Sequence, residues 1–311
     1  MSDVFHAVAK CRWCGGRFRL IYAEFERGQW ICEREACAEK QVAHAIVREE
    51  IAPGYSPYLF LPLPLQVDME TSPCKRLLVA GAAGACKSYG GRWLAYKLCK
   101  ATPGLQVLLI RETLTQLFDN HLKYMTTECA SLGGAKYVGG NKPRVDVSNG
   151  AQITMGYCAD RSHLPNITGP EWDVIIIEEG NNIIKEALIE LPLRDRGSNT
   201  AKRGAGIPQD GRTIILANPG GRGAMTLIDH YITKDVDREE VADYDPSHYG
   251  FFGAKLEDNP YLPESYQKTQ FMGLSIARYN QLRHGDWTVS AGNFFHNFDV
   301  SMHVSALEAP L

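Results

Sequence analysis

The strongest constraint on this chain is an apolar segment that leads straight into a loop of small residues and then into a helix. The sequence from Arg76 to Ser88 is Arg-Leu-Leu-Val-Ala-Gly-Ala-Ala-Gly-Ala-Cys-Lys-Ser. Leu77 to Ala80 predict a buried strand, and Gly81 to Cys86 predict a loop with almost no side chains. A predicted helix begins at Lys87. This order of strand, loop and helix is typical of a phosphate-binding loop.

The loop matches the pattern G-x-x-x-x-G-K-[ST] at all but one of its fixed positions. We expect phosphate to bind the backbone of Gly81, Ala82, Ala83, Gly84, Ala85 and Cys86. In such loops the lysine, here Lys87, reaches the terminal phosphates, and the hydroxyl of the next residue, Ser88, binds Mg2+. Cys86 replaces the second glycine, so a side chain crowds the backbone where phosphate comes closest. The alternative interpretation is an ordinary joint between a strand and a helix.

Length and composition limit the classes of protein to consider. With 311 residues, of which 44% are hydrophobic, the chain has room for one large α/β domain and a small additional module. The net charge of −3 gives no overall nucleic-acid signal, so any DNA contact must be local. The sequence has no apolar run of about 18 residues and no hydrophobic N-terminal signal segment. We therefore expect no membrane contact and no export.

Residues 1–50 predict a separate zinc-binding module. Cys11 and Cys14 form one pair, Cys32 and Cys37 form a second, and the segment between the pairs is short and aromatic. Four thiolates would make a closed tetrahedral Zn2+ site, which supplies folding energy that so short a segment cannot obtain by burial. The alternative is a set of unliganded thiols. Ala38 to Glu50 at the end of this module predict a helix.

The rest of the chain divides into a linker, a main domain and a short tail. Residues 51–75 are rich in proline and predict an extended linker. Residues 76–290 alternate strand and helix patterns, which predicts an α/β domain with a mostly parallel sheet, helices on both faces and a C-terminal helical pair. Arg144 to Val147 and Ala151 to Met155 predict a hairpin with a type I′ turn at Asn149-Gly150. Residues 291–311 form the tail.

A second chemical signal is a strand that ends in two acids. Trp172 to Gly180 reads Trp-Asp-Val-Ile-Ile-Ile-Glu-Glu-Gly. β-Branched residues followed by acids predict a central strand whose carboxylates emerge at its C-terminal end, where ligands gather in open α/β sheets. In P-loop enzymes the first acid, here Glu178, holds Mg2+, usually through water, and the second, Glu179, polarises the attacking water. Two solvated acids at a strand end are the alternative.

Thr213 to Ala217 predict a further buried strand, which ends at Asn218. A polar side chain at the tip of a strand beside the acids can sense the γ-phosphate, and Asn218 is our candidate for this role. Several arginines lie between the two strands. Arg194, Arg196 and Arg203 are candidates for an arginine finger supplied to a neighbouring subunit. The alternatives are contact with DNA phosphates and solvated surface arginines.

Taken in order, these pieces resemble the ATPase half of the large terminase subunit of tailed bacteriophages. The likeness covers about Tyr58 to Trp287. Besides the phosphate loop, it rests on Asn149–Tyr157, Gly169–Gly180, Ala217–Gly221, Asp258–Leu262 and Leu282–Trp287. The resemblance implies a P-loop NTPase fold of the ASCE type and an ATP hydrolase.

The resemblance also implies a biological role. Members of the family use ATP and Mg2+ to push double-stranded DNA through a portal protein into an empty procapsid in the host cell cytoplasm. They work as homo-oligomeric rings, usually pentamers, with a small terminase subunit that selects the genome. Many carry a C-terminal nuclease. Gly292 to Phe295 resemble the lead-in to that nuclease, but its acidic metal ligands do not follow here, so we expect no nuclease activity from this sequence.

The chain departs from the family pattern at the site itself. Cys86 replaces a glycine, Glu178 replaces the usual aspartate, and alanines fill the part of the phosphate loop where many large terminases carry an arginine. The positive charge that compensates the phosphates during hydrolysis would then come from outside the loop, from an arginine of a neighbouring subunit. We therefore expect slow hydrolysis by the monomer. Two alternatives stay open. One is another P-loop DNA-translocating ATPase of the helicase or transposition type, and the other is a non-hydrolysing ATP-binding assembly adaptor disabled by Cys86.

Overall fold

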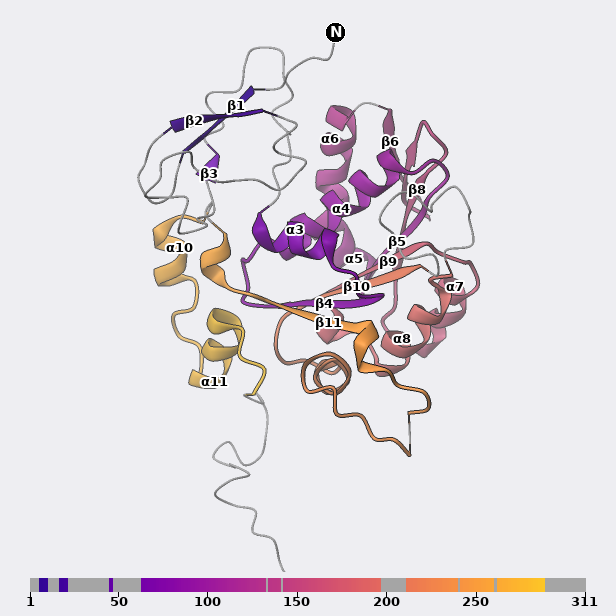
Figure 1. The fold of residues 1–311 in the computed structure, drawn as a ribbon, viewed down its shortest axis with the longest axis vertical. Helices are drawn as coiled ribbons and strands as arrows, with labels where there is room; N and C mark the ends of the chain where they lie inside the picture. The colour runs from indigo at the N-terminus through magenta and orange to yellow at the C-terminus, as the bar shows by residue number, and fades with distance from the viewer. Residues whose placement is uncertain are drawn as a thin grey trace, which may run out of the picture.

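The computed structural model describes residues 6–10, 17–21, 45–46, 63–132, 134–140, 142–196, 211–239, 241–259 and 262–288 (Figure 1). The predicted zinc ligands Cys11, Cys14, Cys32 and Cys37 lie outside the described residues, as do Arg203 and the tail from residue 291. Within the described ranges, no helix is long and apolar enough to cross a membrane.

The main sheet contains eight strands in the order β11-β4-β10-β9-β5-β8-β7-β6. The neighbours from β11 to β8 pair in parallel, and β7 and β6 extend the sheet antiparallel at one edge. The strands are β4 (Arg76–Gly81), β5 (Gln106–Arg111), β6 (Ala135–Val138), β7 (Arg144–Val147), β8 (Gln152–Tyr157), β9 (Val174–Glu178), β10 (Arg212–Ala217) and β11 (Tyr249–Ala254). This confirms the predicted α/β class with a mostly parallel sheet.

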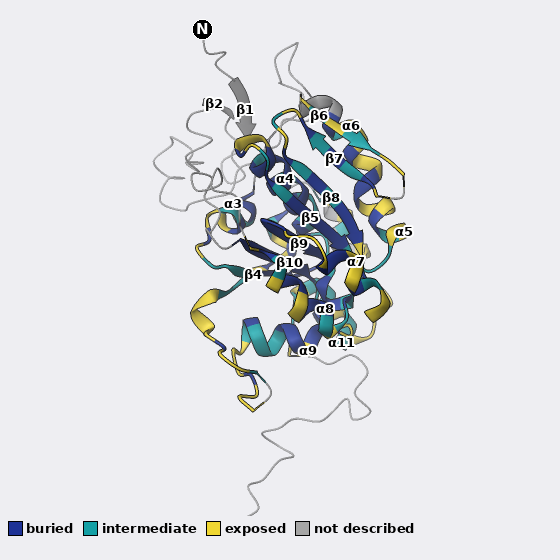
Figure 2. Ribbon diagram, turned by 90° about the vertical axis from the view of Figure 1, so that its right-hand side faces the viewer, coloured by how far each residue is buried: buried dark blue, intermediate teal, exposed yellow. Residues whose placement is uncertain are grey.

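Helices cover both faces of this sheet, as predicted, and its central strands are buried between them (Figure 2). On one face, residues such as Val79, Leu109 and Ile176 pack against α3 (Pro64–Thr71), α4 (Lys87–Ala101) and α6 (Lys123–Leu132). On the other face, alternate residues such as Leu78 and Ile177 pack against α7 (Leu164–Thr168), α8 (Lys185–Glu190) and α9 (Ala224–Leu227). Burial on both faces explains why these strands read as continuous apolar runs.

The helix predicted from Leu114 to Leu132 is present but interrupted. α5 (Leu114–Leu117) passes through a π-helical turn, Phe118–Leu122, into α6. Such turns concentrate at functional sites. This one carries His121, whose side chain is completely buried. The predicted C-terminal pair is also found, as α10 (Glu264–Thr269) and α11 (Ile276–Tyr279), the latter continued by a π-helical turn, Asn280–His284.

Several local predictions were wrong. The hairpin turn is not type I′, because only Gly150 has a positive φ, and the Gly150 N–H donates to the Val147 carbonyl across a three-residue loop. The predicted helix Ala38–Glu50 contains a strand instead, β3 (Ala45–Ile46), which pairs with β1 (His6–Lys10), itself paired with β2 (Arg17–Ile21). The linker is not extended throughout, since α3 occupies its second half.

Candidate functional site

Four neighbouring parallel strands end at one edge of the sheet and each contributes one part of the candidate site. β4 leads into the phosphate loop, β10 ends beside Asn218, β9 ends in Glu178 and is followed by Glu179, and β5 ends in Arg111. Because the carboxyl ends of parallel strands meet at one edge, side chains far apart in the sequence converge there.

The phosphate loop is held from outside by the C-terminal part of the chain. The Ala82 N–H donates to the Ala254 carbonyl at 2.8 Å, and the Ala83 N–H donates to the Leu282 carbonyl at 2.8 Å. Among the described residues, no carbonyl or side chain accepts from the N–H groups of Gly84, Ala85 and Cys86. The first amides of α4 also have no partner within their helix. These open N–H groups at a helix N-terminus fit a phosphate.

Cys86 takes the backbone conformation that the missing glycine would have. Its φ of 60° and ψ of 20° are left-handed, and it is one of the few non-glycine residues with positive φ. Its thiol is hydrogen-bonded with the side chain of Asn259, which also donates to the Gly84 carbonyl at 2.6 Å. Burial raises the pKa of the Cys86 thiol to about 11, so the thiol is neutral at physiological pH.

Lys87 is buried and its ammonium group is hydrogen-bonded inside the loop. Nζ donates to the Ala82 carbonyl at 2.7 Å and to Asn218 Oδ1 at 2.8 Å. Burial lowers its pKa to about 8, against the opposing effect of Glu179 and Glu178. A bound phosphate would place a negative charge next to this buried ammonium group and so favour its protonated form.

Ser88 and Glu178 form a pair of oxygen donors beside the loop. Ser88 Oγ donates to Glu178 Oε2 at 3.0 Å, and Glu178 is only 1% exposed. Within the described structure, Glu178 Oε1 is buried without a hydrogen-bond partner. A hydroxyl and a carboxylate with a spare oxygen match the ligands that Mg2+ prefers, so these residues fit that ion. No group of three or more His, Cys, Asp or Glu in the described ranges could hold a metal by itself.

Glu179 faces Asn218 from the neighbouring strand end. Asn218 Nδ2 donates to Glu179 Oε1 at 3.3 Å, while the backbone N–H of Asn218 donates to Asn181 Oδ1. Glu179 has a left-handed φ of 50° and a partly exposed side chain. Asn218 therefore contacts both Lys87 and Glu179, which are the groups expected to flank a γ-phosphate.

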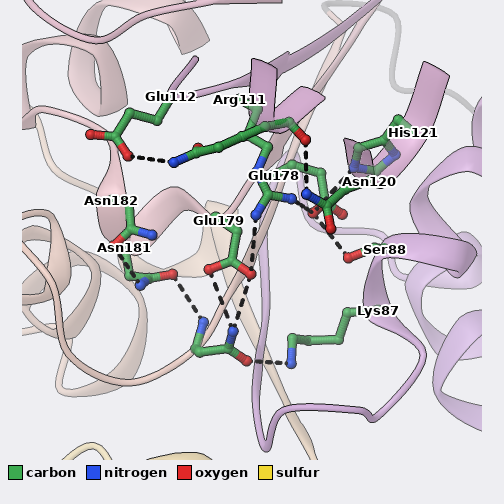
Figure 3. Close-up of polar contacts among 12 residues, drawn as sticks. Lys87, Ser88, Arg111, Glu112, Asn120, His121, Glu178, Glu179, Asn181 and Asn182 are labelled. Carbon is green, nitrogen blue, oxygen red and sulfur yellow. Dashed lines mark hydrogen bonds and ion pairs between the residues drawn. The ribbon is translucent and has the colours of Figure 1, made fainter. Parts of the chain in front are cut away.

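Two residues of the site were missed from the sequence. Arg111 Nη1 lies 3.7 Å from Glu178 Oε2, and its Nη2 lies 3.8 Å from Glu179 Oε1 (Figure 3). His121 Nε2 lies 3.5 Å from Glu178 Oε2. Burial alone would raise the pKa of Glu178, but His121, Arg111 and Ser88 outweigh it and leave that pKa below its ordinary value. Arg111 could have been identified from the sequence, because it lies at the end of a predicted strand. Nothing in the sequence around His121 indicates that this residue belongs to the site.

Arg194 and Arg196 do not lie with these residues. The Arg194 carbonyl accepts from the N–H of Trp172, just before β9, and Arg196 pairs with Glu171 at 2.8 Å. Asp195 between them accepts from Thr213, near the start of β10. The two arginines thus lie at the amino ends of the strands, opposite the phosphate loop, and could reach such a loop only in another subunit.

Comparisons with known proteins agree with this geometry. The family model described as "Terminase large subunit, T4likevirus-type, N-terminal" matches residues 81–302. The large terminase of a thermophilic bacteriophage shares 16% identity at a TM-score of 0.58, over 78% of this chain and 58% of that terminase. The complex of the same terminase with ATP-gamma-S matches with 15% identity at a TM-score of 0.52, over 80% of this chain and 59% of that one. A search of curated proteins found no match.

Proposed function

The chain belongs to the family of terminase large subunits of the T4-like type, and from this membership and the site we propose that it is an ATP-hydrolysing motor of viral genome packaging. It spans about 58% of the length of the large terminase from the thermophilic bacteriophage. The observation that carries the proposal is the convergence of Lys87, Ser88, Glu178, Glu179 and Asn218 at one sheet edge beside a loop of open N–H groups.

Each residue has a chemical role in this proposal. The loop amides and Lys87 bind the phosphates of ATP, and Ser88 and Glu178 hold Mg2+, which neutralises charge on the phosphates when bound. Glu179 orients the attacking water for in-line displacement and accepts its proton. Asn218, which contacts both Lys87 and Glu179, responds to loss of the γ-phosphate. The ATP-gamma-S complex of the thermophilic phage terminase supports nucleotide binding at this fold.

We extend the proposal to partners on the basis of family membership. The motor works as a homo-oligomeric ring, a pentamer in our proposal, that pushes double-stranded DNA through a portal protein in the host cell cytoplasm, with a small terminase subunit. DNA is gripped through its backbone, so binding is tolerant of sequence and weakened by salt. A neighbouring subunit supplies a finger from Arg194, Arg196 or Arg203. A Zn2+ ion stabilises the fold of the N-terminal module and is bound by Cys11, Cys14, Cys32 and Cys37.

The test is ATP turnover against protein concentration, with and without long double-stranded DNA. We expect turnover per subunit to rise with concentration or DNA and to fall by roughly 10³-fold or more in Glu179→Gln. Glu190→Gln, which removes an exposed carboxylate at the end of α8, is the matched control and should keep wild-type turnover. High turnover that is independent of concentration would contradict a site completed between subunits. Undiminished turnover in Glu179→Gln would refute the assignment of the base.

A further inference from the structure

We propose that Arg111 is an internal counter-ion that holds the Glu178 and Glu179 carboxylates in position before Mg2+ binds. The inference rests on the proposed function in one respect, namely that Glu178 is the acid on the metal side. Arg111 would be a positioning residue on β5, and it belongs neither to the phosphate loop nor to β9, the strand that ends in the acids.

The strand order places Arg111 between the two acids. β5 and β9 are parallel neighbours, and Ile110 pairs with Ile177, so the next residues along, Arg111 and Glu178, leave the sheet side by side. One guanidinium nitrogen faces each carboxylate, at 3.7 and 3.8 Å. Arg111 is only 12% exposed and Glu178 only 1%, so solvent screens these charges weakly. Without a cation between them, two adjacent carboxylates in such a place would repel each other.

The length of these contacts suits a temporary counter-ion. At 3.7 to 3.8 Å the guanidinium attracts both carboxylates without occupying their lone pairs in short hydrogen bonds. Glu178 Oε1 is left without a partner among the described residues. An incoming Mg2+ would therefore find a carboxylate that is already ionised, already oriented and still free to bind.

Lys87 and Arg222, the other cations at this sheet edge, form their hydrogen bonds and ion pairs with other described residues. Lys87 donates to Ala82 and Asn218, and Arg222 pairs with Glu112 and donates to the Asn182 and Ala159 carbonyls. His121 lies within ion-pair distance of Glu178, but the structure gives it no contact with Glu179. Within the described part of the chain, Arg111 is thus the cationic group that lies within ion-pair distance of both acids.

The experiment measures thermal unfolding of the full chain without nucleotide or DNA, once without added Mg2+ and once with excess Mg2+. We expect Arg111→Gln to lower the midpoint without Mg2+ by roughly 5 °C, because the acids lose their counter-charge. Excess Mg2+ should restore part of that loss, while it shifts the wild type less. Arg144→Gln, which removes a surface arginine paired with Asp146, is the control and should respond to Mg2+ as the wild type does.

A second variant separates charge balance from packing. If Arg111 acts as a counter-ion, Glu178→Gln added to Arg111→Gln should raise the midpoint without Mg2+ above that of Arg111→Gln alone. The proposal is overturned if Arg111→Gln keeps the wild-type midpoint, or if its loss is the same in Mg2+ and is not relieved by Glu178→Gln. These readouts need no ATP turnover. A protein without turnover that shows the expected pattern would refute the motor and leave the counter-ion in place.

Discussion

Cys86 has left-handed backbone dihedrals at the last position of the phosphate loop. For a residue with a Cβ atom this conformation costs roughly 1–2 kcal/mol, and glycine avoids that cost. The thiol is hydrogen-bonded with Asn259, whose amide in turn donates to the Gly84 carbonyl, and these contacts help to hold the loop. Cys86 thus takes the left-handed conformation that glycine would take, so we expect that the cysteine does not by itself disable the loop.

Substitution of Cys86 tests whether the thiol is accommodated. We expect Cys86→Gly to change the free energy of unfolding by less than about 1 kcal/mol, since relief of strain opposes the lost burial and the entropy of glycine. ATP turnover should stay within about twofold. Cys86→Val should cost roughly 1–2 kcal/mol, because a β-branched residue tolerates positive φ poorly. Urea unfolding measures the stability of both variants, and an ATPase assay measures their turnover. A large rise in turnover in Cys86→Gly would favour the non-hydrolysing adaptor.

The buried ammonium group of Lys87 makes nucleotide binding depend on pH. Its folded pKa of about 8 lies below the ordinary value of 10.5, so the charged form is lost as pH rises through 8. ATP binds the protonated form of Lys87, so binding above pH 8 should return a proton to the amine. Affinity should therefore be steady below pH 7 and fall above pH 8, by at most about tenfold per pH unit. Calorimetry at pH 8.5 in buffers of different ionisation enthalpy should show proton uptake on binding. Binding without proton uptake would argue against a depressed pKa.

At the level of elements, the C-terminal helical pair packs directly on the phosphate loop. A Cβ on Gly285 would lie 2.8 Å from Gly81 Cα and 2.9 Å from the Ala82 nitrogen. Arg278, on α11, donates to the carbonyl of Pro219, the residue after Asn218. The same pair of helices therefore contacts both the phosphate loop and the loop after Asn218. In the proposed motor, we expect movement of either loop to move the pair, which would be a physical route from hydrolysis to translocation.

Two glycines next to these helices provide a matched test of that contact. Gly285 and Gly273 have positive φ of 69° and 80°, but a Cβ on Gly273 would meet nothing within 4 Å. Both alanine variants should lose roughly 1–2 kcal/mol of folding stability, because a residue with a Cβ atom is strained at positive φ. Only Gly285→Ala should lose further stability, by a few kcal/mol, together with nucleotide affinity. Chemical unfolding and nucleotide titration check this. Equal losses in the two variants would show that the close approach does not matter.

The elements that the sequence predicted are those with local signals. Strand β4 with its loop and α4, and β9 with its two acids, each show their pattern within a dozen residues. β11 was missed because Tyr249–Ala254 contains two glycines and has a mostly half-buried pattern, unlike the apolar central strands. The turn at Gly150 was misjudged because Asn149-Gly150 fits more than one loop geometry, and loop length decides between them.

At the level of the whole molecule, strand order was beyond prediction. The central parallel strands are all apolar and of similar length, so nothing in their sequences says which lie side by side. That order nevertheless builds the site. Arg111 meets Glu178 because β5 adjoins β9, and Asn218 meets Glu179 because β10 adjoins β9 on its other side. The phosphate loop, the two acids and Asn218 were found from the sequence, but Arg111, His121 and the contacts among all these residues were not.

The pairing of β4 also governs when the molecule can assemble during synthesis. Arg76 at the start of this strand pairs with Thr213 on one side and Tyr249 on the other, so both neighbours come from much later in the chain. A strand with only distant partners stays unpaired while the ribosome makes the intervening residues, and closing such long loops is slow. We therefore expect the phosphate loop to be fixed late in folding during synthesis. On this basis, a nascent chain should become able to bind nucleotide only after nearly the whole domain has emerged.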